Sequence, residues 1–174
     1  GVNISEFTPE NRFRYGAETR AKLGLKPDDT VAVFSGWEFR RKGLMQIIKA
    51  MPHIRDMKLL VLGGDNPQPY VEEARKLGVG GRVFFTGHVV DIPRYYAAAD
   101  LMIFPTVYEP FGLVVTEAMA SGLPVLVSRC AGAAELITDG RDGVLIDDPT
   151  DPEEISEKTN WLLGGGFAEK MGAE

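Results

Sequence analysis

The stretch LMIFPTVYEPFGLVVTEAMASGLPVLVS, residues 101–128, decides the fold of this chain. Its first four residues are apolar and predict a buried strand, and residues 105–110 predict a turn. A helix of small residues is expected from Gly112 to about Ser121, before a second buried strand at residues 125–128. Because strand, helix and strand in this order are typical of a parallel βαβ unit, the stretch predicts an α/β fold.

The same alternation runs through the whole chain. Apolar runs of strand length lie at residues 31–35, 59–62, 83–86, 101–104, 125–128 and 144–146. Helical patterns lie between or around them, at residues 9–23, 44–51, 70–77, 92–99, 132–137 and 152–163. Residues 44–51 carry one apolar stripe, and Asp151 is placed to cap the last helix. We therefore predict a Rossmann-like three-layer sandwich with a mostly parallel six-stranded sheet.

Composition limits the functions that the chain can have. With 174 residues, 44% of them apolar, it can bury one core, and no apolar stretch is long enough to cross a bilayer. One cysteine and two histidines argue against a disulfide framework and against a metal site. A net charge of -6 argues against nucleic acid as the main partner. We expect a soluble, cytoplasmic chain.

Two groups of residues after predicted strands point to a ligand. Glu109 and Glu117 flank the start of the helix at Gly112, where free backbone amides favour an anion and where helical side chains lean back toward the N-terminus. Carboxylates accept hydrogen bonds from sugar or ribose hydroxyls. After the first strand, GWEFRRKG ends in Arg41 and Lys42, which can neutralise a diphosphate. A nucleotide sugar has this combination of charge and hydroxyls.

At these residues the chain resembles glycosyltransferase family 4. The resemblance rests on the paired glutamates of EPFG-x4-E at residues 109–117, and it extends from about Gly1 to Trp161. Further matching segments are RRKG at 40–43, VLGGD at 61–65, RVFFTG at 82–87 and AADLMIFPT at 98–106. The resemblance implies that residues 1–163 are the C-terminal, nucleotide-sugar-binding half of a two-domain GT-B enzyme. It also implies that residues 164–174 are a truncated tail and that the N-terminal acceptor domain is absent from this chain.

The resemblance further implies a chemistry and a set of site residues. The enzyme would move a hexose from a UDP or GDP sugar to a glycan, lipid or other acceptor, with retention of configuration and without a metal or other cofactor. Glu109, Arg41 and Lys42 would be catalytic. The donor-binding residues would be Gly36, His88, Val89, Phe111, Gly112, Leu113, Thr116 and Glu117. Thr116 could instead cap backbone within the helix.

One departure from the family concerns Trp37. Relatives often have an arginine or another polar residue there, so the phosphate charge falls to Arg41 and Lys42 in this chain.

Several alternatives stay open at this point. The chain could be a free-standing nucleotide-sugar-binding module, or a sugar phosphorylase or epimerase of the same fold. It has no GxGxxG or P-loop pattern, which argues against a dinucleotide oxidoreductase or an NTPase. We expect the fragment alone to be inactive. Lipopolysaccharide or another surface glycan is the expected product class, and contact of the full-length enzyme with the inner face of a membrane is left open.

Overall fold

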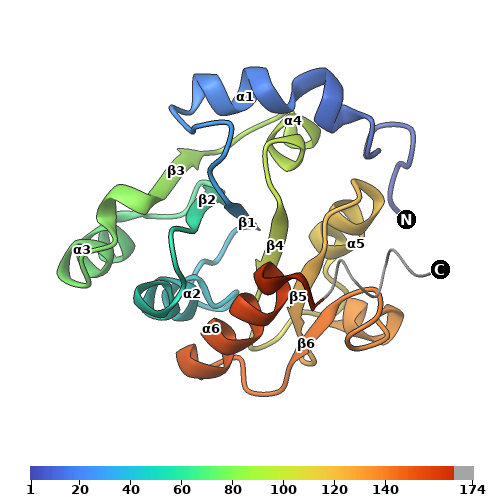
Figure 1. Cartoon of the computed structure of the whole chain (residues 1–174). Coiled ribbons are helices and arrows are strands. Elements are labelled where there is room, and N and C mark those ends of the chain that lie inside the picture. Colours follow the sequence, from blue (N-terminus) through green and yellow to red (C-terminus); the bar gives the residue numbers. More distant parts are fainter. Residues whose placement is uncertain (167–174) are drawn as a thin grey trace.

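The computed structural model describes residues 1–166 and contains one six-stranded sheet (Figure 1). The strands are β1 (Val31–Ser35), β2 (Lys58–Leu62), β3 (Val83–Gly87), β4 (Leu101–Phe104), β5 (Val125–Ser128) and β6 (Val144–Ile146). Four of them have the predicted bounds, and β2 and β3 are each one residue longer. Every neighbouring pair in the sheet is parallel, so the expected fold is confirmed and the sheet is wholly rather than mostly parallel.

Helices occupy the predicted segments, some of them shortened. The α-helices are α1 (Ala17–Lys22), α2 (Leu44–Ala50), α3 (Gln68–Lys76), α4 (Ile92–Ala97), α5 (Leu113–Ala120) and α6 (Pro152–Trp161). Short π-helical segments are η1 (Arg12–Gly16) and η5 (Leu162–Gly166). Short 3-10 helices are η2 (Met51–His53), η3 (Gly80–Arg82) and η4 (Gly132–Leu136). Asp151 caps α6 as predicted, because its carboxylate accepts the Glu153 amide at 2.8 Å. The predicted tail begins within η5, and residues 167–174 lie outside the described residues.

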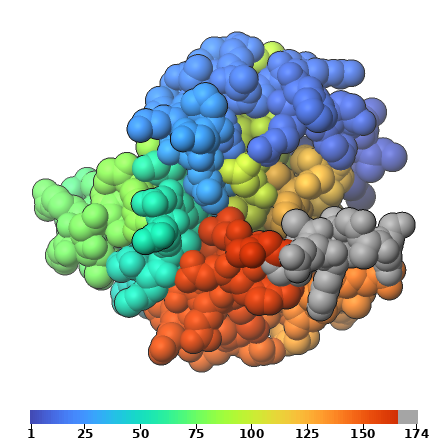
Figure 2. Space-filling view, in the orientation of Figure 1, coloured from blue at the N-terminus to red at the C-terminus, as the bar shows by residue number. Residues whose placement is uncertain are grey.

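Alternate strand residues face opposite layers, and each layer has its own core. On β1, Ala32 and Phe34 belong to the core beneath α2, α3 and α6, whereas Val31 and Val33 belong to the core beneath α4 and α5. Figure 2 shows α6, in red, at the surface of the molecule, and α6 packs against α2. Burial on both faces explains why the strands are continuous apolar runs. No helix among residues 1–166 is long and apolar enough to span a membrane.

The strand order creates one particular place for a ligand. The order is β3-β2-β1-β4-β5-β6, so the chain first builds outward from β1 to β3 and then returns to place β4 on the other side of β1. In open parallel sheets, ligands bind beyond the carboxyl ends of the strands at such a switch. The loops after β1 and β4 contain the two groups of candidate residues, and the topology places them side by side at this edge.

Candidate functional site

Backbone bonds hold the loop after β4 between the loops that follow β1 and β5. The Arg41 carbonyl accepts the Val107 amide at 3.0 Å, and the Glu109 carbonyl accepts the Gly132 amide at 3.0 Å. Gly43 permits the first of these approaches: its φ is +80°, and a Cβ there would lie 2.1 Å from the Pro105 carbonyl oxygen. A larger residue at position 43 would force the two loops apart. Backbone hydrogen bonds therefore fix the loops that contain both groups of candidate residues.

The Glu109 carboxylate lies between the two basic residues of the first loop. Its Oε2 is 3.5 Å from Arg41 Nη1 and 3.6 Å from Lys42 Nζ. The side chains of Glu109 and Lys42 keep only 16% and 13% of their exposure to water. The structure thus brings together the three residues expected to be catalytic, although they were predicted from segments almost seventy positions apart.

Arg41 is largely occupied by contacts within the protein. Its guanidinium forms an ion pair with Glu38 at 2.6 Å and donates to the Tyr108 carbonyl. The hydrogen bond to Glu38 is the main reason that the pKa of Arg41 is raised. Arg41 lines a hollow beside Gln46, which shares no lining residue with the cleft described next. Arg41 can therefore fix Glu109 and the loop, and it has fewer donors left for a ligand than the sequence suggests.

Lys42 points into a cleft of about 180 Å³ at the switch point. Its ammonium lies close over Gly36, whose missing side chain leaves the space that the lysine fills, and 5.5 Å from the centre of the Phe104 ring. Among residues 1–166, no acceptor lies within hydrogen-bond distance of Lys42 Nζ. A mostly buried ammonium with three unused donors is equipped to bind an anion.

The start of α5 adds backbone donors to this region. Gly112 has a left-handed φ of +92° and ends the turn, and Leu113 begins the helix. In the part of the chain that the structure describes, the amides of Phe111 and Gly112 have no backbone partner. The Thr116 hydroxyl donates to the Leu113 carbonyl at 2.9 Å, so it stabilises the first turn and keeps only its acceptor lone pairs for a ligand.

Glu117 lies on α5, beside Tyr96 of α4. Burial is the main cause of its raised pKa, and the nearby charge of Glu6 adds to it, whereas a hydrogen bond from Tyr96 acts in the opposite sense. The Tyr96 hydroxyl is buried beside both Glu117 and Ser35, and Ser35 lines the cleft. Glu117 is thus connected to the cleft through Tyr96 and Ser35 and is not itself part of the cleft wall.

His88 and Val89, which follow β3, line the same cleft. Trp37 lies with them, although no site role was predicted for it. Its indole is 54% exposed, and its ring centre is 5.6 Å from that of His88. The available signal was a large aromatic residue directly after the glycine that ends the first strand. That signal could not be interpreted without the structure, which places the indole over Gly64 after β2 and beside His88 after β3.

A comparison with known protein families agrees with this geometry. Residues 17–173 match the family described as glycosyl transferases group 1. The chain is 34% identical to the lipopolysaccharide glucosyltransferase WaaG of Escherichia coli K12, over 88% of this chain and 41% of that protein. A crystal structure of WaaG, a glycosyltransferase involved in lipopolysaccharide biosynthesis, superposes with a TM-score of 0.83 over 98% of this chain and 46% of that one, at 32% identity.

Two further solved structures are similar. The Anabaena protein HepE, in complex with UDP-glucose, has a TM-score of 0.83 at 29% identity, covering 98% of this chain and 48% of HepE. The C-terminal domain of the group 1 protein LpcC from Francisella tularensis has a TM-score of 0.80 at 25% identity, covering 98% of this chain and 92% of that domain.

These matches show which part of a larger architecture the fold represents. The chain spans less than half the length of WaaG and HepE but nearly all of the LpcC C-terminal domain. The fold therefore matches one half of a GT-B glycosyltransferase, as the resemblance to the family implied. The chain belongs to the group 1 glycosyl transferases, which are glycosyltransferase family 4.

Proposed function

We propose that this chain is the donor-binding domain of a retaining hexosyltransferase that uses a UDP sugar. The observation that carries the proposal is Lys42, whose mostly buried ammonium faces the cleft with no hydrogen-bond acceptor among the described residues. The Anabaena protein HepE has been solved in complex with UDP and with UDP-glucose, which supports UDP rather than GDP as the nucleotide. The acceptor would be a surface glycan or its lipid-linked precursor, as the lipopolysaccharide relatives suggest.

Glycosyl transfer breaks the bond between the sugar and the diphosphate, so negative charge builds up on the leaving group. Lys42 and the amides of Phe111 and Gly112 lie at the same edge of the sheet and would stabilise that charge. Arg41, which is paired with Glu38, would act chiefly by holding Glu109 in position. These donors are fixed before the reaction, which is what electrostatic catalysis requires.

The two glutamates would have different tasks. Glu109, at the rim beside Lys42, would accept hydrogen bonds from the hydroxyls of the transferred hexose. Glu117, beside Tyr96, would accept from the ribose hydroxyls after a small rotation toward Ser35. The remaining donor contacts would come from Gly36, His88, Val89, Leu113 and Thr116.

We also propose that the reaction needs no metal, because Lys42 and the helix amides already supply positive polarisation at the diphosphate. The test is to measure UDP affinity in EDTA and again with added Mg²⁺ or Mn²⁺. The two values should agree within about twofold, since one lost charge-assisted bond alone would change affinity by roughly tenfold or more. A much tighter complex with either cation would contradict metal independence.

The central experiment is a calorimetric titration of this chain with UDP, GDP, ADP, UDP-glucose and inorganic phosphate. UDP and UDP-glucose should bind most tightly, and phosphate should bind weakly. Equal binding of phosphate and UDP would favour a sugar phosphorylase, and tighter binding of GDP would correct the nucleotide. If none of the nucleoside diphosphates binds to the folded chain, the donor-binding proposal is wrong.

We further propose that the chain alone transfers no sugar, because acceptor groups would come from a second domain. Incubation with UDP-glucose and candidate acceptors should release no UDP above the rate of hydrolysis in buffer. Transfer by the isolated chain would contradict this division of labour. Binding without any turnover in the full-length protein would instead support a sensing module.

A further inference from the structure

One large side chain of the cleft has no part in the chemistry described so far. Trp37 follows Gly36 at the end of β1, and the residue is 54% exposed. It lies over Gly64, since a Cβ on that glycine would be 2.6 Å from the indole ring. Its ring centre is 5.6 Å from that of His88, with 41° between the planes. The two rings form a short aromatic ledge across the ends of three strands.

The backbone holds Trp37 firmly in this position. On one side, the Gly36 amide donates to the Leu62 carbonyl at 2.9 Å. On the other, the Phe39 amide donates to the Asp65 carboxylate at 3.0 Å, and the Phe39 ring is fully buried. These bonds fix the backbone on both sides of Trp37. Such preorganisation lowers the entropy cost of stacking on a planar partner.

The rest of the cleft suits a flat, partly apolar group. Gly36 and Gly63 place no side chains in it, and Val89, Ile92 and Val114 give it an apolar lining. The Lys42 ammonium lies close over Gly36 and the His88 ring lies beside Trp37, so the cleft carries a charged group and aromatic groups. A nucleoside diphosphate offers the matching groups, an anionic diphosphate and an aromatic base.

We propose that Trp37 is the stacking platform for the base of the donor nucleotide, with His88 extending the platform. This inference rests on the proposed donor function and names a residue where relatives often have a polar side chain. Stacking is tolerant of base identity because every base has an aromatic face. Trp37 therefore contributes affinity for nucleoside diphosphates in general, and the choice between bases depends on other contacts.

The test compares UDP with inorganic pyrophosphate, which has the charge but no base. Trp37→Ala should weaken UDP binding by roughly 10- to 100-fold and leave pyrophosphate binding unchanged, as expected for the loss of one stacked base. Trp37→Phe should recover most of the loss. His88→Ala should cost a few-fold, whereas His53→Ala, which changes the other histidine of the chain, should cost nothing. Circular dichroism would confirm that each variant is folded.

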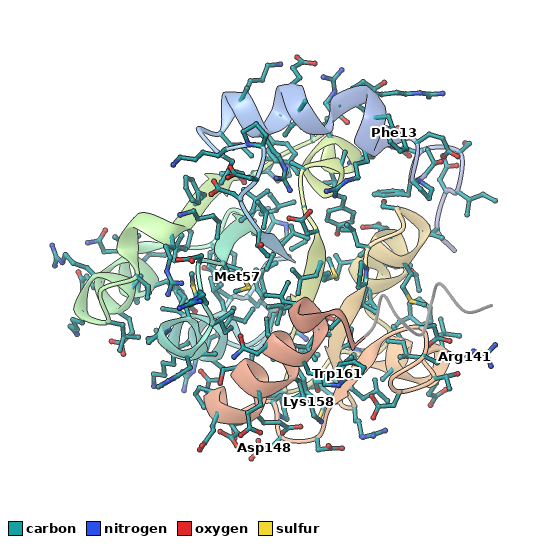
Figure 3. The ribbon with its side chains drawn as sticks, in the orientation of Figure 1. Phe13, Met57, Arg141, Asp148, Lys158 and Trp161 are labelled. Atoms are coloured by element: carbon teal, nitrogen blue, oxygen red, sulfur yellow. The ribbon has the colours of Figure 1, made fainter. Side chains whose placement is uncertain are left out.

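A second measurement does not depend on the stability of the alanine variant. The chain has two tryptophans, and Trp161 lies on α6 (Figure 3), so Trp161→Phe leaves Trp37 as the only indole. UDP should quench the emission of this variant, and pyrophosphate should not. A stacked base changes the indole directly, whereas a purely structural role for Trp37 predicts no base-specific change.

The outcomes separate the two proposals. If Trp37→Ala retains full UDP affinity, or UDP leaves the Trp37 emission unchanged, the stacking inference is wrong and the donor site stands. If UDP binds no more tightly than pyrophosphate to the wild-type chain, the base is not recognised and only the diphosphate site stands. If neither compound binds, both proposals fall.

Discussion

Two charged clusters follow strands at the same edge of the sheet, and they differ in how well their charges are satisfied. The first, the site cluster, consists of Arg41, Lys42 and Glu109 after β1 and β4. The second, the α6 cluster, consists of Arg129, Asp147, Glu154 and Lys158 after β5 and β6 and on α6. Figure 3 labels Lys158 on α6 and Asp148 in the loop before it.

In the α6 cluster the donors and acceptors match one another. Lys158 Nζ donates to the Leu145 carbonyl at 2.6 Å and to Asp147 at 2.9 Å, and it pairs with Glu154 at 2.5 Å, which uses all three of its protons. Arg129 binds the other oxygen of Asp147 at 2.6 Å. Lys42, by contrast, has only Glu109 at 3.6 Å. We infer that the first arrangement stabilises the fold, whereas the second is completed by a ligand.

The largest expected effect is on Lys42. Lys42→Ala should weaken UDP binding by roughly 10- to 100-fold, because a charge-assisted bond to the diphosphate is lost. It should change the free energy of unfolding by less than about 1 kcal/mol, since the ammonium has no acceptor within hydrogen-bond distance among the described residues. Calorimetry and urea denaturation measure the two quantities.

Lys158→Ala is the matched control for this prediction. It should leave UDP affinity unchanged and reduce stability by about 1 kcal/mol or more, because three hydrogen-bonding groups lose their partner. Lys49→Ala, at an exposed position near the end of α2, should change neither quantity. The comparison between the clusters fails if Lys42→Ala destabilises the fold while UDP affinity is preserved.

A smaller effect is expected at Glu109. Glu109→Gln should lower the affinity for UDP-glucose several-fold, because an amide oxygen accepts sugar hydroxyls less strongly than a carboxylate does. The affinity for UDP itself should stay the same or rise slightly, since a negative charge beside Lys42 has been removed. The ratio of the two affinities is the measurement. Glu38→Gln is the control, because that side chain is 64% exposed and pairs with Arg41.

Sequence patterns predicted the fold well because burial on both faces leaves a simple signal. Each strand is a continuous apolar run bounded by a turn, so its position was evident without knowledge of its neighbours. The α-helix expected at 132–137 is the exception: the chain there forms only the tight turn η4, and a Cβ on Gly132 would lie 2.2 Å from the Pro110 carbonyl oxygen. Contacts between distant loops decided that outcome, and local propensity does not contain them.

The site could be predicted in composition but not in detail. The sequence placed Arg41, Lys42 and Glu109 together, and the structure confirms that they meet. It could not show that neighbouring residues Arg41 and Lys42 face different hollows, because that depends on the turn that places Glu38 at a φ of +58°. The sequence also could not show that Glu117 lies beside Tyr96, because this contact joins two separate helices, α4 and α5.

The raised pKa of Glu117 leads to a prediction about stability. Burial favours the protonated carboxyl group in the folded chain. The free energy of unfolding therefore falls as the pH rises from the pKa of Glu117 in the unfolded chain through its higher pKa in the folded chain. Glu117→Gln should therefore be more stable than the wild type at pH 7, by less than about 1 kcal/mol because the side chain keeps some contact with water. The two proteins should have equal stability near pH 4. Higher stability of the wild type at pH 7 would mean that Glu117 has a cationic partner.

Asp147 in the α6 cluster should show the opposite pH dependence and the smallest effect. The hydrogen bond from Lys158, and then that from Arg129, lower its pKa to about 2. The folded chain thus favours the carboxylate, and the stabilisation is present above the ordinary aspartate pKa of 3.8 and lost as the pH falls toward 2. Because its side chain is 63% exposed, water screens the pairs, and Asp147→Asn should cost less than about 0.5 kcal/mol at pH 7. Urea denaturation from pH 7 to pH 3 should show this difference shrinking while UDP affinity at pH 7 stays unchanged. A loss of UDP affinity in this variant would mean that the α6 cluster also serves the ligand, and the distinction between satisfied and unsatisfied charges would no longer separate structure from function.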